Sequence, residues 1–299
     1  MILHRCRVAV PVTAILLLGW WWVWHGIDAA AQPAPEDAVL VGAGDIASCN
    51  SDGDEATARL LDTIPGTVFT AGDNAYERGT DDEFRECYRP TWGRHRARTR
   101  PAPGNHDYGT PGAAGYFRYF GAAAGEPGRG YYSYTLGTWQ VLVLNSNCRA
   151  IGGCGDGSRQ MAWLRAELAN HRAQCTVAIW HHPPFSSGLH GSQPETQPLW
   201  AALYQSGGDV VIAGHDHSYE RFAPQDAQGR PDPTGMRLFV VGTGGRSHYR
   251  FRTPLPTSEV RHTGTFGILK LVLRPGRYEW EFVPEAGKTF HDSGSAVCR

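Results

Sequence analysis

Four apolar segments of the chain each run into an Asp or a His, and this arrangement limits the possible folds more than any other feature. These segments have the length and composition of buried β-strands and lie at residues 38–43, 67–71, 176–180 and 209–213. The polar residues that follow them are, in order, Asp45, Asp73, His181 and the pair His215 and His217. Because open α/β sheets bind ligands at the carboxyl ends of their strands, we expect these side chains to meet at one edge.

The rest of the chain continues an alternation of strands and helices. Helical spacing is found at 54–64, 160–171 and 196–205, and further strands are predicted at 139–145 and 238–241. Two β-rich segments near the end, 266–273 and 277–283, are separated by Arg-Pro-Gly, which is typical of the turn between antiparallel strands. The pattern predicts one α/β domain over residues 38–299.

The first 31 residues differ from the remainder. Arg5 and Arg7 precede an apolar segment at 8–24, and Ala29-Ala30-Ala31 follows, as in a secretory signal peptide with its cleavage site. An uncleaved N-terminal anchor is the alternative, since the apolar segment approaches the length of a membrane-spanning helix. We therefore expect a secreted or extracytoplasmic protein with a Pro-rich linker at 32–37, attached to a membrane only if the N-terminal segment is retained.

The charges of the chain nearly cancel. Lys and Arg total 28 and Asp and Glu total 29, which gives a formal net charge of -1 at pH 7. A chain with this balance has no broad positive field for a polyanion, so we expect no nucleic-acid partner.

Cysteine usage agrees with export. Loss of residues 1–31 removes Cys6 and leaves an even set, namely Cys49, Cys87, Cys148, Cys154, Cys175 and Cys298. Six cysteines allow about 15 pairings, and free buried thiols are the alternative. The short Gly-rich separation favours Cys148 with Cys154, a bond from Cys175 to Cys298 would fix the chain end, and Cys49 with Cys87 then remains.

A fifth loop, Pro103-Gly104-Asn105-His106-Asp107, adds further polar side chains to the expected cluster. Carboxylates, imidazoles and an amide oxygen together suit transition metals better than Ca²⁺ or Mg²⁺, which prefer oxygen ligands alone. The number of candidate ligands indicates two metal ions that share a bridging carboxylate. Glycines before Asp45, Asp73, Asn105 and His215 are expected to permit the sharp turns that direct these side chains inward.

Five ordered blocks carry a resemblance to a known family. They are Gly44-Asp45, Gly72-Asp73-Asn74-Ala75-Tyr76, Gly104-Asn105-His106-Asp107, His181-His182-Pro183-Pro184-Phe185 and Gly214-His215-Asp216-His217. The chain thereby resembles the calcineurin-like metallophosphoesterases, and more closely the purple acid phosphatases. Ala47 and Ala178 depart from the usual purple phosphatase pattern without removing a ligand. The resemblance implies a β-sandwich core flanked by helices, in αββα layers.

The resemblance also implies a set of metal ligands. One ion would be held by Asp45, Asp73, Tyr76 and His217. The other would be held by Asp73, Asn105, His181 and His215, with Asp73 as the bridge. A tyrosinate stabilises ferric iron, so Tyr76 implies Fe³⁺ with a divalent second ion, which would be Fe²⁺, Zn²⁺ or Mn²⁺.

The implied activity is that of an acid phosphatase-like hydrolase. A metal-bound hydroxide would attack the phosphorus of a small phosphomonoester, and His106 would stabilise the transition state or protonate the leaving group. Asp107 would set the tautomer of His106, and His190 resembles a substrate-facing histidine. The alternatives are a phosphodiesterase of the same superfamily and a non-catalytic, metal-stabilised binding domain.

Two further interpretations concern neighbouring residues. The segment Gly42 to Ala47 matches a dinucleotide-binding fingerprint, but Asp45 would oppose the pyrophosphate charge, so this function is not expected. Alternation along the strand end predicts that His182 points away from His181. The histidines outside the blocks are expected in surface or loop positions, and they are His95, His171, His248, His262 and His291.

Overall fold

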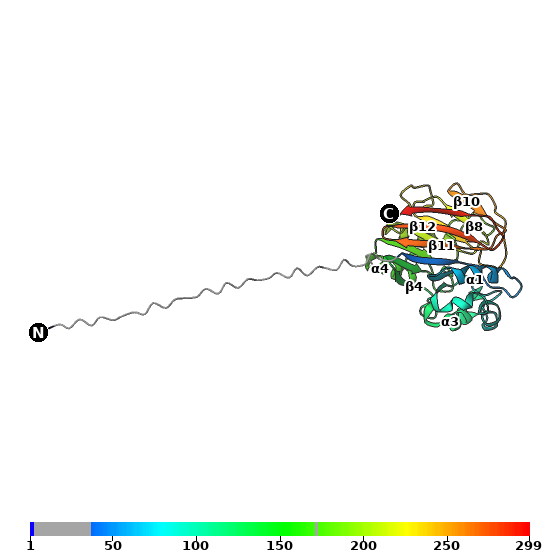
Figure 1. Ribbon diagram of the computed structural model, residues 1–299, viewed down its shortest axis with the longest axis horizontal. Helices are drawn as coiled ribbons and strands as arrows, with labels where there is room; N and C mark the ends of the chain where they lie inside the picture. The colour runs from blue at the N-terminus through cyan, green and yellow to red at the C-terminus, as the bar shows by residue number, and fades with distance from the viewer. Residues whose placement is uncertain (3–36, 171–172) are drawn as a thin grey trace. The chain divides into compact units, whose positions relative to one another are not determined.

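The structure is a computed structural model that describes residues 1–2, 37–170 and 173–299 (Figure 1). The expected signal or anchor segment beyond Ile2, the linker up to residue 36, and His171 lie outside these ranges. The described residues from Asp37 to Arg299 belong to one compact unit. Within the described ranges, no helix combines the length and the apolar character needed to cross a membrane.

The first of two β-sheets has six strands in the order β13-β12-β11-β1-β2-β3. Its strands are β1 (Ala38–Ala43), β2 (Thr67–Ala71), β3 (Thr99–Ala102), β11 (Gly267–Arg274), β12 (Arg277–Pro284) and β13 (Asp292–Val297). β1, β2 and β3 run parallel, whereas β11, β12 and β13 are added to β1 by antiparallel pairing. The predicted C-terminal hairpin is therefore present as β11 and β12.

The second sheet has seven strands in the order β10-β8-β9-β7-β6-β5-β4. Its strands are β4 (Tyr132–Leu136), β5 (Trp139–Val143), β6 (Cys175–Ile179), β7 (Val210–Ala213), β8 (Tyr219–Phe222), β9 (Arg237–Val241) and β10 (Ser258–His262). The four central strands β5, β6, β7 and β9 are parallel. Two parallel blocks of strands thus belong to different sheets.

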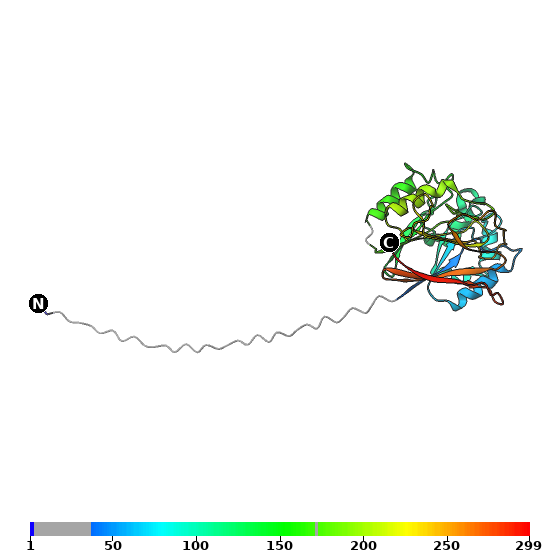
Figure 2. The same cartoon turned by 90° about the horizontal axis from the view of Figure 1, so that it is seen from above.

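Helices cover the outer faces of the two sheets. The α-helices are α1 (Gly53–Thr63), α2 (Asp81–Glu83), α3 (Ala114–Phe120), α4 (Arg159–Asn170) and α5 (Gln197–Gln205). Shorter helical turns lie at Phe84–Tyr88, Trp92–Arg98, Asp107–Gly109, Pro111–Ala113, Gly121–Ala124 and Pro194–Thr196. In Figure 2 the green and yellow-green helices α4 and α5 lie on one side of the sheets and the blue helix α1 on the other. The expected αββα layering is confirmed.

Alternating burial along the central strands produces two apolar layers. On β5, Trp139, Val141 and Val143 belong to the cluster that contains residues of both sheets. Leu142 instead packs with Leu164 of α4 and with α5 residues. Because successive side chains of a strand point to opposite faces, a strand buried on both faces has an uninterrupted apolar sequence. This burial on both faces explains why these strands can be predicted from the sequence.

The strands that the pattern did not predict lie at or near sheet edges. β3 contains Pro101 and is the last strand of its sheet, the position where proline is tolerated because one side needs no ladder hydrogen bond. β13, at the opposite edge, has the weakly apolar sequence Asp-Ser-Gly-Ser-Ala-Val. Edge strands bury less surface, so their sequences carry less of the apolar pattern.

The three predicted disulfides are confirmed. Cys49 pairs with Cys87, Cys148 with Cys154, and Cys175 with Cys298, with Cα–Cα distances of 5.0, 5.1 and 5.7 Å. The third bond ties the end of the chain to the start of β6.

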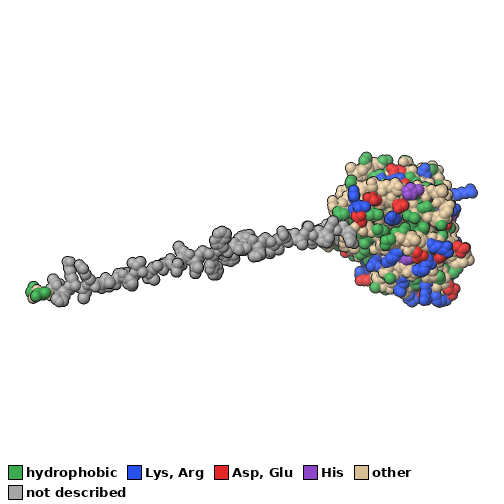
Figure 3. Space-filling view, viewed as in Figure 1, with side chains coloured by type: hydrophobic (Ala, Val, Ile, Leu, Met, Phe, Trp, Pro, Cys, Tyr) green, Lys and Arg blue, Asp and Glu red, His purple; other side chains and the backbone are tan. Residues whose placement is uncertain are grey.

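On the face shown in Figure 3, positive and negative side chains are interspersed over the domain.

Candidate metal centre

The polar side chains predicted to cluster come from the carboxyl ends of strands in both sheets. Asp45, Asp73 and Asn105 follow β1, β2 and β3, whereas His181 and the pair His215 and His217 follow β6 and β7. Hydrogen bonds join the two edges. The Asp45 carboxylate accepts from the His215 amide at 2.8 Å, and the Gly44 amide donates to Val241 at 2.8 Å. The site therefore lies where the two sheets meet.

Three of these residues have a left-handed backbone conformation that is unusual without glycine. The φ angles are 61° for Asp45, 51° for Asp73 and 73° for His215. Such conformations carry a cost and occur preferentially at functional sites, where the surroundings hold them in place. The local backbone at the strand ends is thus arranged to direct these side chains inward.

The neighbouring glycines are required mainly for space, which corrects the expectation that they supply the turns. Of the four, Gly72 has a positive φ, of 83°. A Cβ atom on Gly104 would lie 2.1 Å from Oδ1 of Asp73, and one on Gly214 would lie 2.7 Å from Oδ2 of Asp45. Glycine is needed because the backbone passes directly against the carboxylates.

Three donor groups surround the hydroxyl of Tyr76, which is itself a fourth. This hydroxyl lies 2.9 Å from Oδ1 of Asp45, 3.0 Å from Oδ2 of Asp73 and 3.2 Å from Nε2 of His217. Nε2 of His217 lies 3.3 Å from Oδ1 of Asp45. Separations of about 3 Å suit donors that share one ion at bond lengths of about 2.1 Å.

A second group surrounds the Nε2 atom of His181. This nitrogen lies 3.2 Å from Oδ2 of Asp73, 3.0 Å from Oδ1 of Asn105 and 3.2 Å from Nδ1 of His215. Oδ2 of Asp73 thus contacts both groups of donors.

Hydrogen bonds orient two of the imidazoles. Nδ1 of His181 lies 2.8 Å from the carbonyl oxygen of Ala71, which only accepts, so Nδ1 carries a proton and Nε2 is the nitrogen that faces the cluster. Nδ1 of His217 lies 2.7 Å from the hydroxyl of Ser247, and its Nε2 faces Tyr76. Both Nε2 atoms therefore face the cluster as potential ligands.

The electrostatics of the cluster fit a bound cation. Asp45 and Asp73 are buried, and among the described residues their ion-pair partners are histidines rather than Lys or Arg. Burial opposes a charge on His181, but the Asp73 and Asp45 carboxylates and the Ala71 carbonyl together raise the pKa of His181 to about 9. Burial would raise the pKa of Asp73, but its contacts with His181 and His106 together hold this pKa well below its usual range.

The donor chemistry points the same way. Ligand atoms of Asp45, Asp73 and His181 all lie within 4.8 Å of one another. Burial, followed by the negative charges of Asp45 and Asp73, raises the pKa of Tyr76 well above its ordinary value of 10.0. Buried carboxylates that lack a Lys or Arg partner, beside imidazoles and an amide oxygen, form a donor set suited to transition metals.

His106 lies at the rim of the cluster. Its side chain is 33% exposed, and its Nε2 atom is 4.0 Å from Oδ2 of Asp73. Nδ1 lies 2.6 Å from the carbonyl oxygen of Glu77, so this nitrogen carries a proton. The backbone amide of His106 donates to Oδ1 of Asp73 at 2.8 Å. The hydrogen bond to the Glu77 carbonyl thus holds the His106 ring against the loop that carries Tyr76.

Asp107 does not set the tautomer of His106, contrary to expectation. Its carboxylate is buried and accepts hydrogen bonds from the Gly104 amide at 2.8 Å and from the side-chain amide of Asn74 at 2.9 Å. Burial and the negative charge of Asp73 raise its pKa to about 7. Its side chain points back into the domain and ties the loops after β2 and β3 together.

His190 lies at the site, at an exposed position of the loop between β6 and α5. Its ring centroid is 4.5 Å from that of His215, and its backbone amide donates to Oδ1 of Asp216 at 2.8 Å.

Tyr249 lies at the site although the sequence analysis did not predict it there. Its ring is stacked on His217 at 4.0 Å. The segment after β9 carries no motif that would have indicated this contact.

His182 also lies at the site, which corrects the prediction that it points away. Its ring centroid is 4.5 Å from that of His215, and His181, His182 and His215 offer ligand atoms within 4.8 Å of one another. The chain has already left β6 at Ile179, so strand alternation no longer governs its direction. Burial and the charge of His181 lower the pKa of His182 to about 3. The adjacent His-His pair was the sequence feature that could have identified it.

Two arginines near the blocks, Arg221 and Arg246, and the histidines outside the blocks are placed as follows. Arg221 makes an ion pair with Asp292 at 2.7 Å. The remaining described histidines make their contacts away from the cluster: His95 with Asp62, His248 with Phe266, His262 with Phe290 and His291 with Ser293. Arg246 is nearer to the site, since it lies over the ring of Tyr76 and pairs with Glu77.

A family model described as Calcineurin-like phosphoesterase matches residues 24–219. Purple acid phosphatase 21 of Arabidopsis thaliana is 34% identical over 163 residues, which cover 51% of this chain and 36% of the relative. Purple acid phosphatase 23 of the same plant is 30% identical over 227 residues, covering 62% and 48%. The chain thus spans less than half the length of these curated relatives.

Solved structures share the fold. The structure of purple acid phosphatase PPD1 from yellow lupin seeds matches with a TM-score of 0.72 at 17% identity, over 88% of this chain and 54% of that one. At this level of identity the match concerns the arrangement of sheets and helices.

Proposed function

The chain belongs to the calcineurin-like phosphoesterase family, and on that basis we propose that it hydrolyses phosphomonoesters at a dinuclear metal centre. The observation that carries this proposal is the position of Asp73, whose Oδ2 atom lies 3.0 Å from the Tyr76 hydroxyl and 3.2 Å from Nε2 of His181. One carboxylate oxygen is thus in contact with both donor groups, a position that suits a ligand shared by two ions.

Two sets of residues would hold the ions. Asp45, Asp73, Tyr76 and His217 form one set, and Asp73, Asn105, His181 and His215 form the other. When bound, two metal ions supply an acidified water and neutralise charge on a phosphoryl group during in-line displacement. The strand ends hold the ligand side chains in position before substrate binds. Hydrogen bonds with Ala71 and Ser247 orient the rings of His181 and His217.

Tyr76 favours ferric iron in its set. Burial and two neighbouring carboxylates raise the pKa of its phenol, so the phenol would lose its proton to water only when a strongly charged cation binds the resulting phenolate. Fe³⁺ supplies that charge better than a divalent ion. We therefore propose Fe³⁺ beside Tyr76 and Fe²⁺, Zn²⁺ or Mn²⁺ in the other set.

His106 is the proposed proton donor to the leaving group. Because Nδ1 donates to Glu77, proton transfer would take place at Nε2, on the partly exposed face of the ring. Asp107 is a positioning residue in this scheme, since it ties the His106 loop to Asn74. His190 is exposed beside His215 and is proposed to face the substrate.

We also propose that the domain is a single catalytic unit, exported to an oxidising compartment. The three disulfides support export, since such bonds persist outside the cytosol. A small phosphate ester is the proposed partner. The near-zero net charge and the mixed charges in Figure 3 argue against nucleic acid.

Turnover of 4-nitrophenyl phosphate and bis(4-nitrophenyl) phosphate by the purified chain, before and after chelation, tests the proposal. We expect hydrolysis of the monoester, its loss on chelation, and recovery with iron and a divalent ion. Preference for the diester would make the protein a phosphodiesterase. Absence of turnover of either ester by metal-loaded protein would indicate a binding domain.

A further inference from the structure

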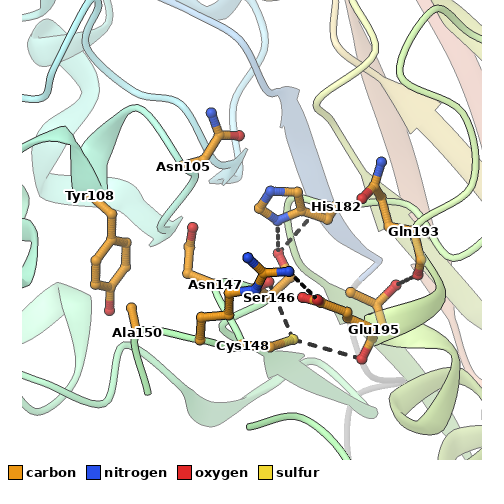
Figure 4. Close-up of a pocket in the computed structure, with 11 residues that line it drawn as sticks. Asn105, Tyr108, Ser146, Asn147, Cys148, Ala150, His182, Gln193 and Glu195 are labelled. Atoms are coloured by element: carbon orange, nitrogen blue, oxygen red, sulfur yellow. Dashed lines mark hydrogen bonds and ion pairs between the residues drawn. The ribbon is translucent and has the colours of Figure 1, made fainter. Parts of the chain in front are cut away.

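A pocket of about 240 Å³ opens beside the candidate metal centre. Asn105 and His182 form its wall on the side of the centre, and Tyr108 lies at one flank (Figure 4). The opposite walls are the segment 146–150 after β5 and residues 193–196 before α5. The pocket is therefore assembled partly from two of the blocks, through Asn105 and His182, and partly from loops outside them.

The pocket is continuous with the cluster. Oδ1 of Asn105 lies 3.0 Å from Nε2 of His181, and the ring of His182 is 4.5 Å from the ring of His215. A phosphate ester held at the centre would therefore have this hollow next to it. The part of the substrate that can fill it is the alcohol portion, which becomes the leaving group.

The walls of the pocket are polar but carry little net charge. Arg149, the cation among the lining residues, is paired with Glu195 at 3.2 Å at an exposed position. A second phosphate or a carboxylate in the pocket would meet the negative charge of Glu195 as well as the positive charge of Arg149. The lining residues therefore provide no unpaired cation to attract a second anionic group of a substrate.

The pocket instead offers neutral hydrogen-bonding groups to a ligand. The Tyr108 hydroxyl accepts from the Asn145 side chain at 2.8 Å, which leaves its own hydrogen for donation. Gln193 makes only long side-chain contacts, of 3.4 and 3.3 Å, to the carbonyl oxygens of His190 and Gly191. Its amide can turn toward a ligand at little cost.

A disulfide fixes one wall. Cys148 and Cys154 are six residues apart, and their loop is also closed by a 2.7 Å hydrogen bond from the Gly153 amide to the Cys148 carbonyl. Arg149 and Ala150 lie on this loop. A wall held in this way presents a fixed shape to the ligand, which favours selection by size.

We propose that this pocket is the leaving-group subsite and that it selects an uncharged, hydroxyl-bearing alcohol of about one sugar ring. The volume lies just below the roughly 300 to 1,000 Å³ of sites for drug-sized ligands, so a single ring fits better than a dinucleotide. The proposal rests on the phosphomonoesterase function proposed above and names its substrate class.

The test compares three esters of primary alcohols: glucose 6-phosphate, ethyl phosphate and 6-phosphogluconate. We expect kcat/KM to be at least about tenfold higher for glucose 6-phosphate than for either other ester. Ethyl phosphate lacks the ring and the hydroxyl groups, and 6-phosphogluconate keeps hydroxyl groups but is open-chain and adds a negative charge. Equal values for the three, or preference for 6-phosphogluconate, would overturn the subsite while leaving the phosphatase function intact.

Variants of the pocket residues test whether the preference for glucose 6-phosphate arises in this pocket. Gln193→Ala should raise KM for glucose 6-phosphate about three- to tenfold, as for loss of one neutral hydrogen bond, and leave ethyl phosphate nearly unchanged. Ala150→Trp, which fills the pocket, should act in the same direction and more strongly. Gln205→Ala, at an exposed position at the end of α5, is the matched control. Equal effects of Gln193→Ala on both esters would contradict the proposal.

Calorimetric titration of the metal-loaded protein with glucose 6-phosphate separates the two proposals. Should none of the esters be hydrolysed, the phosphatase function fails. Binding that is weakened by Gln193→Ala but not by Gln205→Ala would still support the subsite. Absence of binding would overturn it as well.

Discussion

The hydroxyl oxygen of Tyr76 lies 2.9 Å from Oδ1 of Asp45, with both side chains buried between the two sheets. If this phenol binds Fe³⁺ as a phenolate, the oxidised protein should absorb visible light by charge transfer. Tyr76→Phe should bleach that band while the protein remains folded. Tyr249→Phe, which alters the ring stacked on His217, should keep it. A colourless and fully active enzyme that contains only zinc or manganese would contradict this assignment.

His106→Ala should separate proton transfer from metal binding. Positioned proton transfer contributes about 10²- to 10⁴-fold, so turnover of an alkyl phosphate should fall by that order at unchanged metal content. Turnover of 4-nitrophenyl phosphate should fall little, because its leaving group departs without a proton. His291→Ala, at an exposed position, is the control. Loss of metal, or equal slowing of both esters, would show that His106 has a structural or charge-stabilising role.

Asp54 predicts a pH dependence of stability that is independent of the metal centre. It is buried near the start of α1 and accepts a hydrogen bond from Thr91 at 2.8 Å. Burial raises its pKa from the ordinary value of 3.8 to about 6. Between these two values the folded state binds more protons than the unfolded state, so the free energy of unfolding falls as the pH rises from about 4 to 6.

Asp54→Asn should remove about 1 to 3 kcal/mol of this dependence, because it cannot ionise but can still accept from Thr91. Denaturant unfolding at pH 4.5 and pH 7.5 measures the difference. Asp52→Asn, at an exposed position two residues earlier, should leave the dependence unchanged. An equal slope in the wild type and in Asp54→Asn would refute the prediction.

The disulfides should differ in their contributions to stability. They close segments with sequence separations of 123, 38 and 6 residues. Loop-closure entropy in the unfolded chain then gives about 5 kcal/mol for Cys175–Cys298, about 4 for Cys49–Cys87 and about 2 for Cys148–Cys154. Replacing each pair with alanine and measuring the free energy of unfolding checks the order. A reversed order would mean that native-state contacts outweigh chain entropy.

The parts of the fold that could be predicted from sequence are those whose pattern follows from burial on both faces. β1, β2, β6 and β7 have mainly apolar sequences, interrupted only by threonine in β2 and β6, and the residue types that follow them indicate a metal-binding edge. The division into two sheets was not readable from periodicity, because a parallel strand has the same pattern in either sheet. It came from the family resemblance.

Side-chain direction beyond the strand ends could not be predicted. His182 faces the site and Asp107 turns away because the loops there follow neither helical nor strand periodicity. Tyr249 reaches His217 from a segment distant in sequence. Contacts of this kind depend on how loops pack, which the order of residue types does not encode locally.

Elemental analysis of the purified chain, loaded with iron and zinc and then dialysed, tests the central claim most directly. We predict two metal ions per wild-type chain. In Asp73→Asn we predict a lower content, because a neutral amide in contact with both donor groups compensates less cationic charge. His106→Ala should retain both ions. A wild-type chain that holds at most one ion while hydrolysing phosphate esters, or an Asp73→Asn variant that holds two as firmly, would contradict a dinuclear centre bridged by Asp73.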